Sequence, residues 1–296
     1  MTRSPALREQ HEGQMMTTVT ERPVDGTLSI DVEEWFCAHN LSPPLLRRDW
    51  ERCESRVERS MDRLLDLLDA TDSRATFFLL GWVMQRQPQL ATEIIRRGHE
   101  VATHGYDHRM LTSMDANEFE RDLTRCLDLH ARQHQGDVCG YRAPSFSLTD
   151  ATRWAVPVLE RLGLRYSSSV FPMRGHPVYG MPDAPLVPWR IGDRLMEVPL
   201  TVARWHGLRV PCAGGAYFRL LPFPVTLAFL RSVRREERLI NFYLHPWEID
   251  PEQPRVTIPF QKSIRHYHNL HRTEHRLQRL LREFRFTSIK ELPCLQ

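Results

Sequence analysis

Several features that would assign the chain to a specialised class of protein are missing from its 296 residues. No apolar run approaches the roughly 20 residues that a membrane-spanning helix needs. The N-terminal stretch before Thr27 lacks the apolar core of a secretory signal peptide. The formal net charge of +3 is nearly balanced, and the arginines are scattered among acidic residues. The sequence therefore predicts neither a transmembrane segment nor a nucleic-acid partner.

Cysteine is also scarce, and its spacing excludes two common roles. The chain has 6 cysteines and no CxxC pair, which argues against a zinc ribbon and against a disulfide framework. They are Cys37, Cys53, Cys126, Cys139, Cys212 and Cys294. We therefore expect reduced thiols and a cytoplasmic location.

From Thr27 onwards, apolar runs typical of strands alternate with amphipathic helical patterns. The main strand candidates lie in 27–36, 75–83, 99–105, 138–147 and 239–247, and helices are expected near 57–68, 150–162, 223–235 and 269–284. Ser55 and Glu58 predict a capping box for the first helix. This α/β alternation predicts a mostly parallel sheet covered by helices, either open or closed into a barrel. No GxGxxG or GxxxxGK[ST] motif supports a nucleotide-binding open sheet.

Two acids end the first predicted strand. Because side chains alternate along a strand, Asp31 and Glu33 point to one face and Val32 to the other. Two carboxylates on one face suit a cation or a catalytic base, although solvated acids in an exposed turn would give the same pattern. Glu34 points away from this face and is expected to take no part in the chemistry.

Two histidines four residues apart follow the third predicted strand. A chain with 14 histidines would contain roughly 0.7 such pairs by chance, so the spacing alone is a weak signal. The chain has the pairs His104/His108, His130/His134 and His271/His275. Only the first follows a strand, where a helical turn would aim both rings at one point. With one acid, His104 and His108 would form a metal site that keeps positions open for water and substrate.

Two further strand ends carry polar side chains. Arg142, in "GYRAPSFS", is either a surface arginine or a guanidinium that pairs with Asp31 and holds it ionised. His245, in "FYLHPW", is either a buried histidine satisfied by a backbone carbonyl or a general acid in an apolar pocket beside Leu244 and Trp247.

The ordered motifs DxE, HxxxH, RxP and LH resemble the polysaccharide deacetylase family, also called the NodB homology domain or carbohydrate esterase family 4. The resemblance runs from about Thr27 to His245. The flanking sequences "SIDVEEWF", "GYRAPSFS" and "FYLHPWEID", with the arginine-rich tail, are similar to a subgroup found at bacterial exopolysaccharide loci of the exosortase/PEP-CTERM type. The resemblance implies a distorted (β/α) barrel with fewer than eight strands. It also implies a metal-dependent hydrolase that removes N-acetyl groups from acetamido sugars of an exopolysaccharide or its precursor.

The resemblance also implies roles for individual residues. Those matched to the catalytic and metal positions are Asp31 as base, His245 as acid, Arg142 as the tether of the base, and Glu33, His104 and His108 as metal ligands. Those matched to substrate binding are Leu244, Trp247, Tyr141 and Pro144. The implied metal is Zn²⁺, with Co²⁺, Ni²⁺, Mn²⁺ or Fe²⁺ as alternatives.

The chain departs from the family pattern at two places. The second acid of the first motif is Glu33, with Val32 between it and Asp31, so the metal carboxylate could be either acid. The fourth motif supplies only the serines of "YSSSVF" where relatives have an aspartate, so a carboxylate partner for His245 must come from elsewhere.

The expected organisation is a flexible tail over 1–25, a catalytic domain over 26–250 and a C-terminal extension over 251–296 that packs on the same domain. The expected partner is an N-acetylated glycan. Two other functions stay open: hydrolysis of a non-sugar amide on the same fold, as in allantoinase-like relatives, and carbohydrate binding without catalysis.

Overall fold

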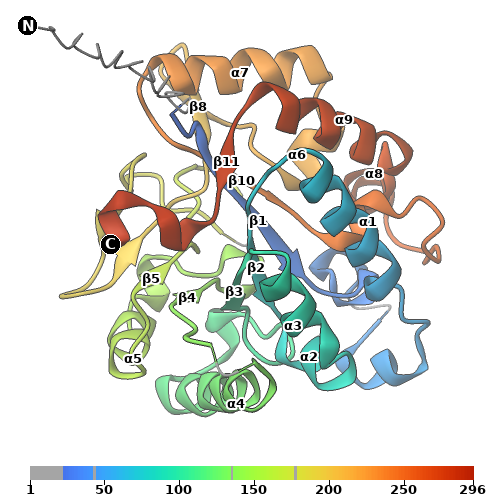
Figure 1. Ribbon diagram of the computed structural model, residues 1–296, viewed down its shortest axis with the longest axis vertical. Helices are drawn as coiled ribbons and strands as arrows, with labels where there is room; N and C mark the ends of the chain where they lie inside the picture. Colours follow the sequence, from blue (N-terminus) through green and yellow to red (C-terminus); the bar gives the residue numbers. More distant parts are fainter. Residues whose placement is uncertain (1–22, 43–44, 135, 177–178) are drawn as a thin grey trace, which may run out of the picture.

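The computed structural model describes residues 23–42, 45–134, 136–176 and 179–296, so most of the predicted tail lies outside the described residues. Its centre is a nine-stranded sheet in the order β10-β1-β2-β3-β4-β5-β7-β6, with β11 also paired to β1 (Figure 1). The strands are β1 Gly26–Val32, β2 Thr76–Leu79, β3 Glu100–Thr103, β4 Gly140–Tyr141, β5 Tyr166–Ser167, β6 Trp189–Arg190, β7 Met196–Glu197, β10 Ile240–Leu244 and β11 Phe286–Thr287.

The sheet has the barrel-like character that the family resemblance implies. Neighbouring strands from β10 through to β7 are parallel, and only β6 and β7 pair in antiparallel fashion. This parallel run has fewer strands than a closed eight-stranded barrel. The edge strands β10 and β6 do not pair with each other within the described residues. The predicted α/β class with a distorted, incomplete barrel is confirmed.

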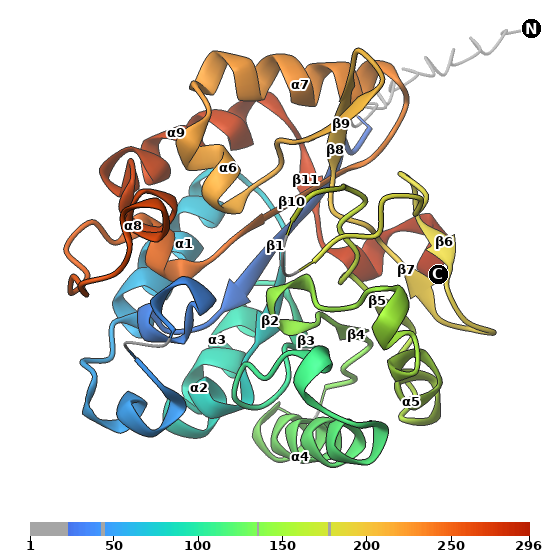
Figure 2. The same ribbon diagram turned by 180° about the vertical axis from the view of Figure 1, so that it is seen from behind.

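Helices cover the outside of the sheet (Figures 1 and 2). They are α1 Val57–Ala70, α2 Gly81–Arg86, α3 Gln89–Arg96, α4 Ala116–His134, α5 Ala155–Arg161, α6 Gly215–Leu220, α7 Phe223–Arg235, α8 Phe260–Tyr267 and α9 Leu270–Glu283. A separate hairpin joins β8 Val202–Trp205 to β9 Leu208–Pro211. None of the helices in the described ranges combines the length and the apolar character needed to cross a membrane.

The first helix begins in a way that the sequence pattern did not predict. Ser55 and Glu58 form no capping box, and α1 begins at Val57 without a cap from the residue before it. Instead, the buried carboxylate of Glu34 accepts hydrogen bonds from the Arg56 amide, at 3.0 and 3.2 Å, and from the Ser55 hydroxyl. An acid at a helix N-terminus satisfies amides that have no partner in the helix. Glu34 therefore positions α1 and turns away from Asp31 and Glu33.

The second predicted strand was too long. β2 ends at Leu79, and α2 begins at Gly81, whose amide donates to the carbonyl of Gly105 at 2.8 Å. A Cβ at Gly81 would lie 2.8 Å from the Tyr106 ring, so glycine lets the chain turn close to the loop that follows β3.

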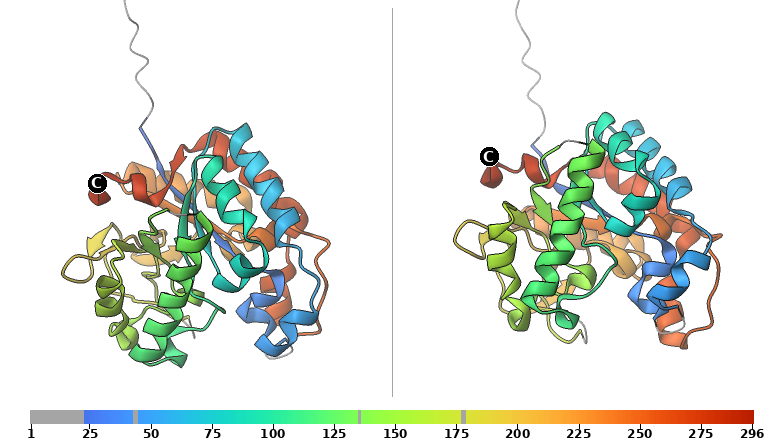
Figure 3. Two further views of the ribbon diagram at one scale, coloured as in Figure 1. Left: turned by 60° about the horizontal axis from the view of Figure 1, so that its bottom comes forward. Right: turned by 90° about the horizontal axis from the view of Figure 1, so that it is seen from below.

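The C-terminal residues belong to the same body as the first strand. β11 pairs with β1 through Gly26 and Thr27. Helix α8 lies against the short 3₁₀ turn His39–Leu41 that follows β1 (Figures 2 and 3). Because neighbouring parallel strands end at one edge of the sheet, the segments after β1, β3, β4 and β10 meet there, next to α8.

Candidate active site

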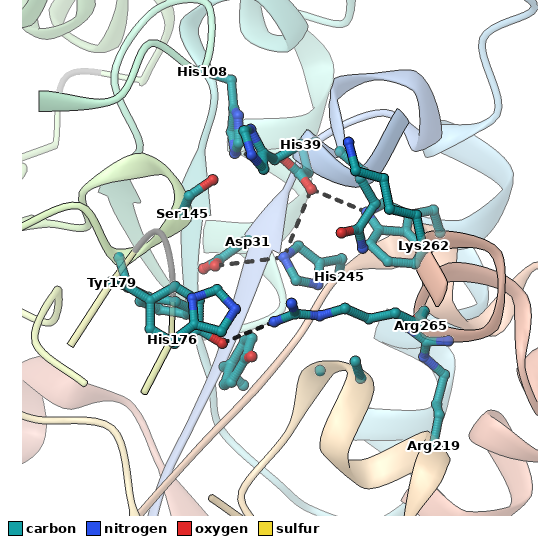
Figure 4. Close-up of a pocket in the computed structure, with 18 of the residues that line it drawn as sticks. Asp31, His39, His108, Ser145, His176, Tyr179, Arg219, His245, Lys262 and Arg265 are labelled. Carbon is teal, nitrogen blue, oxygen red and sulfur yellow. Dashed lines mark hydrogen bonds and ion pairs between the residues drawn. The ribbon is translucent and has the colours of Figure 1, made fainter. Parts of the chain in front are cut away.

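A cavity of about 350 Å³ lies at this edge of the sheet (Figure 4). That volume is at the lower end of the range typical of small-molecule sites. Its wall contains six of the predicted residues: Asp31, Glu33, His104, His108, His245 and Trp247. Three of the four strand-end motifs therefore converge on one space. Arg142, from the fourth, reaches it through its contact with Asp31.

Glu33, His104 and His108 form one compact set of ligand atoms. One ligand atom from each lies within 4.8 Å of the other two, and among the described residues this is the one group of three or more that could hold a metal ion. Oε2 of Glu33 is 3.0 Å from Nε2 of His108. This oxygen is buried and, apart from this contact with His108, has no polar partner within the described part of the chain. A buried carboxylate oxygen facing two imidazoles fits a divalent cation.

The surroundings of His104 prepare it as a ligand. Its Nδ1 lies 2.9 Å from the carbonyl oxygen of Arg142, which can only accept, so Nδ1 carries the proton. The lone pair is therefore on Nε2, the usual arrangement of a metal-bound histidine. Burial lowers the pKa of His104 to about 4, which keeps the ring neutral near pH 7. The imidazole needs no deprotonation before it can bind a cation.

Glu33 is held as an anion. Its Oε1 accepts a hydrogen bond from Trp247 Nε1 at 3.0 Å. Burial by itself would raise the pKa of Glu33, but the neighbouring imidazoles, His108 first, lower it to about 2. Of the two acids, Glu33 is the one whose oxygen lies with the two histidines.

The histidine pair reaches its geometry through a loop, whereas the sequence predicted a helical turn. β3 ends at Thr103, and the next helical residues are the 3₁₀ turn Leu111–Ser113. Gly105 and His108 both have positive φ, 75° and 60°, so the chain turns sharply between the two rings. Positive φ is uncommon for a histidine and costs energy, which is typical of functional sites.

The two other histidine pairs do not form such a set. His271 and His275 are exposed on α9. His130 is buried near the end of α4, and the side chain of His134 lies outside the described residues.

Arg142 and Asp31 form the predicted pair. Nη1 of Arg142 donates to Oδ1 of Asp31 at 2.7 Å and to the hydroxyl of Ser29 at 2.8 Å. Arg142 is fully buried, and its Nε and Nη2 donate to the carbonyl and the hydroxyl of Ser168, both at 2.7 Å. Ser168, in the "YSSSVF" segment where relatives have an aspartate, thus helps to hold Arg142 in place. Since Arg142 occupies Oδ1, Oδ2 of Asp31 remains available to the cavity.

The carboxylate partner of His245 is Glu248, which the sequence analysis missed. Nδ1 of His245 lies 2.7 Å from Oε1 of Glu248, so Nε2 points toward the acids, 3.9 Å from Oδ2 of Asp31 and 3.6 Å from Oε1 of Glu33. Burial by itself would lower the pKa of His245, but the hydrogen bond to Glu248 and the nearby carboxylates raise it to about 9. The spacing offered a signal, because an acid three residues after a helix cap often reaches back to it. The same carboxylate accepts the His245 amide at 3.1 Å.

A buried arginine completes this arrangement. Nε of Arg219, on α6, donates to Oε2 of Glu248 at 2.6 Å, and both side chains are almost fully buried. The remaining Arg219 donors reach the carbonyl oxygens of Arg265, His266 and His268 at 2.9, 2.7 and 3.1 Å. The orientation of His245 therefore depends on α6 and on the C-terminal end of α8.

Of the four predicted substrate contacts, only Trp247 lines the cavity, where its ring stacks on His245 at 5.0 Å. Tyr141, Pro144 and Leu244 are not among the lining residues, so their contact with a substrate stays a prediction. Leu244 alternates with Tyr243 and His245 along the chain and so points into the opposite core. Tyr141 packs against Phe119 of α4.

The cavity mouth contains residues that no motif indicated. Besides Ser145 and Phe146, which follow Pro144, the wall includes His39, His176, Tyr179, Lys262 and Arg265. Figure 4 shows most of these side chains gathered around His245. Lys262 and Arg265 belong to α8, beyond the segment covered by the family resemblance.

Two segments of the chain are similar to known protein families. Residues 51–167 match the family described as polysaccharide deacetylase. Residues 168–293 match a second family, described as a domain of unknown function (DUF3473). Strands from both matched segments and the earlier strand β1 share one sheet.

Individual relatives match shorter segments or the fold alone. A peptidoglycan deacetylase-like protein of Gibberella zeae is 31% identical over 110 residues, 36% of this chain and 32% of that protein. A peptidoglycan-N-acetylglucosamine deacetylase of Bacillus cereus is 33% identical over 61 residues, 21% of this chain and 29% of that protein. The matched segments thus span about a third of these relatives' own length. A solved structure from Mycobacterium smegmatis, assigned to the polysaccharide deacetylases, has a similar fold, with a TM-score of 0.55 and 21% identity over 89% of this chain and 86% of that one.

Proposed function

We propose that the protein is a metal-dependent hydrolase that removes N-acetyl groups from acetamido sugars. The observation that carries this proposal is the convergence of Glu33, His104 and His108 on one cavity wall that also holds Asp31 and His245. A purely carbohydrate-binding protein would need neither a tethered carboxylate nor a paired imidazole at that place.

Glu33, His104 and His108 would hold the divalent cation, for which Zn²⁺ is the first candidate. When bound, the cation would supply Lewis-acid polarisation of the acetyl carbonyl and of the attacking water. The residues themselves fix the rest of the geometry. The carbonyl of Arg142 holds the His104 tautomer, and Trp247 fixes the carboxylate of Glu33.

Asp31 acts as the general base. As the water oxygen bonds to the acetyl carbonyl carbon, a water proton passes to Oδ2 of Asp31, the oxygen that Arg142 leaves free. The ion pair with Arg142 keeps the carboxylate in one orientation.

His245 acts as the general acid. As the bond between the carbonyl carbon and nitrogen breaks, Nε2 of His245 gives its proton to the sugar nitrogen, which leaves as an amine while the acetyl group leaves as acetate. Glu248 holds Nδ1 and so directs Nε2 toward Asp31 and Glu33. The proton taken up by Asp31 returns to His245 or to solvent before the next turnover.

Acetate release tests this function. The protein loaded with Zn²⁺ should release acetate from N-acetylglucosamine oligomers, while the chelator-treated protein should not until metal is restored. Release of product from allantoin or another non-sugar amide, with none from any acetamido sugar, would favour the alternative amide hydrolase. Binding of the oligomers without acetate release would favour a carbohydrate-binding protein.

We further propose that the substrate is a bacterial exopolysaccharide or its precursor, modified in the cytoplasm before export. The six cysteines, which are all unpaired in the structure, support a reducing compartment. Cell fractionation that finds the protein in the periplasm with formed disulfides would contradict this location.

A further inference from the structure

A pair of cations lies at the mouth of the cavity, apart from the acids at its floor. Lys262 and Arg265 are three residues apart on α8, so they share one helix face. Both are half-buried and line the same cavity as Asp31 and His245. In Figure 4 the guanidinium of Arg265 reaches toward Tyr179 near His245, and the side chain of Lys262 lies on the other side of His245.

No acid of the described residues neutralises either cation. Nζ of Lys262 donates to the carbonyl oxygen of Ser42 at 2.8 Å, and Nη2 of Arg265 donates to the hydroxyl of Tyr179 at 3.1 Å. Among the described residues, no carboxylate oxygen lies within 4.0 Å of either cation. Arg219, another cation on the wall, is in contrast paired with Glu248 at 2.6 Å. Lysine has three donors and arginine five, so most of the donors of Lys262 and Arg265 have no acceptor within the described protein.

The acids of the wall cannot supply the missing charge. Within the described lining, the carboxylates are Asp31 and Glu33. Asp31 is paired with Arg142, and Glu33 lies among the candidate metal ligands. A divalent cation at that set would add further positive charge to the cavity. The mouth therefore keeps two uncompensated positive charges in a partly dehydrated space.

The two histidines at the mouth report the same positive field. Burial lowers the pKa of His39, and the charges of His108, Lys262 and Arg265 lower it further. Burial, followed by the charges of Arg265 and His39, lowers the pKa of His176 to about 4.

We propose that Lys262 and Arg265 form a subsite for an oxyanion, so that the substrate is an acetamido glycan with a phosphate ester or a carboxylate close to the sugar that loses its acetyl group. This inference rests on the proposed deacetylase function and narrows its substrate class. A neutral sugar would dehydrate both cations and pair them only with hydroxyl groups, whereas an oxyanion would form charge-assisted hydrogen bonds with both.

Three substrates distinguish the sources of the oxyanion. They are N-acetylglucosamine 1-phosphate, a disaccharide of glucuronic acid and N-acetylglucosamine, and the neutral N,N′-diacetylchitobiose. We expect kcat/KM for acetate release to be at least about tenfold higher for one anionic substrate than for the neutral one. The free energy of a hydrogen bond to a charged group corresponds to a factor of about ten or more. The phosphate and the uronate arms then show which oxyanion the subsite prefers.

Variants assign the preference to the two cations. Lys262→Gln and Arg265→Gln should each reduce the ratio of anionic to neutral kcat/KM about tenfold. Lys262→Arg and Arg265→Lys keep the positive charge, so these variants should retain most of the preference for the anionic substrate. Arg272→Gln is the matched control because it removes the same charge from an exposed position on α9 outside the cavity wall, and it should leave the ratio unchanged.

The outcomes separate this inference from the proposed function. Equal kcat/KM for acetate release from neutral and anionic substrates would overturn the subsite while the deacetylase function stands. The same conclusion would follow if both glutamine variants kept the ratio of anionic to neutral kcat/KM. If no substrate releases acetate, the deacetylase function fails, and calorimetry decides the subsite. N-acetylglucosamine 1-phosphate should then bind more tightly than N-acetylglucosamine, and Arg265→Gln should abolish the difference. Equal binding would overturn the subsite as well.

Discussion

The two walls of the cavity are built by different means. On the metal wall, Glu33, His104 and His108 come from the segments directly after β1 and β3, and one backbone carbonyl fixes His104. On the acid wall, His245 is oriented by Glu248, which accepts a hydrogen bond from Arg219 of α6. Arg219 in turn donates to carbonyl groups at the C-terminal end of α8. The first wall needs only strand ends and tight turns. The second depends on a buried chain of charges that joins three distant segments.

The largest expected effect concerns the metal wall. His104→Ala and His108→Ala should each lose both the bound metal and the release of acetate. The loss of metal affinity should exceed the roughly 10–100-fold seen when a residue that hydrogen-bonds to a metal ligand is removed. His271→Ala, at an exposed position of another HxxxH pair, should keep both. Metal content of the purified proteins, measured by mass spectrometry, checks this. Equal metal content in all three variants would refute the assignment.

The next effect separates the two carboxylates. Asp31→Asn should keep its metal but lose about 10⁴-fold in kcat, because an amide cannot accept the proton. Glu33→Gln should lose metal affinity first, and added metal should partly restore its activity. Metal titrations followed by acetate assays distinguish the two. If Asp31→Asn loses the metal and Glu33→Gln retains it, the roles are exchanged.

The acid wall is tested by His245→Ala. We expect metal and substrate binding to persist while kcat falls roughly 10²–10⁴-fold, the usual contribution of a general acid. Single-turnover assays with metal analysis on the same sample check this. An unchanged kcat, or a loss accounted for by missing metal, would make His245 a structural residue.

A smaller effect should come from Glu248, which acts through His245. Glu248→Gln should lower kcat about 10- to 100-fold and leave KM little changed. This is the range found when a residue that hydrogen-bonds to a functional side chain is removed. In a His245→Ala background the same change should cost nothing further, since two residues that act as a unit are not additive. The control is Glu252→Gln, an exposed acid nearby. An equal loss in both backgrounds would show that Glu248 only supports the fold.

The difference between the walls also explains what the sequence could predict. Asp31, His104, His108 and Arg142 each end or follow a strand within a short motif, and strand alternation together with the parallel sheet brings them to one edge. Strand alternation in the DxE motif also assigned Glu33 to the site and excluded Glu34, which accepts hydrogen bonds at the start of α1.

The contacts that depend on distant packing could not be predicted in this way. Arg219, Lys262 and Arg265 follow no motif, and their positions result from how α6 and α8 pack against each other. The helical turn predicted for His104 and His108 was wrong because the positive φ of His108 depends on the surrounding loop. Leu244 and Tyr141 were assigned to the cavity by resemblance, although their side chains point into the opposite cores.

The central place of β1 in the sheet also constrains how the chain folds. This first strand pairs with β10, and the Thr27 hydroxyl bonds to Asn241, 214 residues further along. Loop-closure entropy makes such distant pairings slow to form. During synthesis, one edge of β1 therefore has no partner strand until β10 has been made. An unpaired strand edge promotes aggregation. Variants that are truncated before Ile240 should consequently accumulate as insoluble protein, whatever their effect on the catalytic groups.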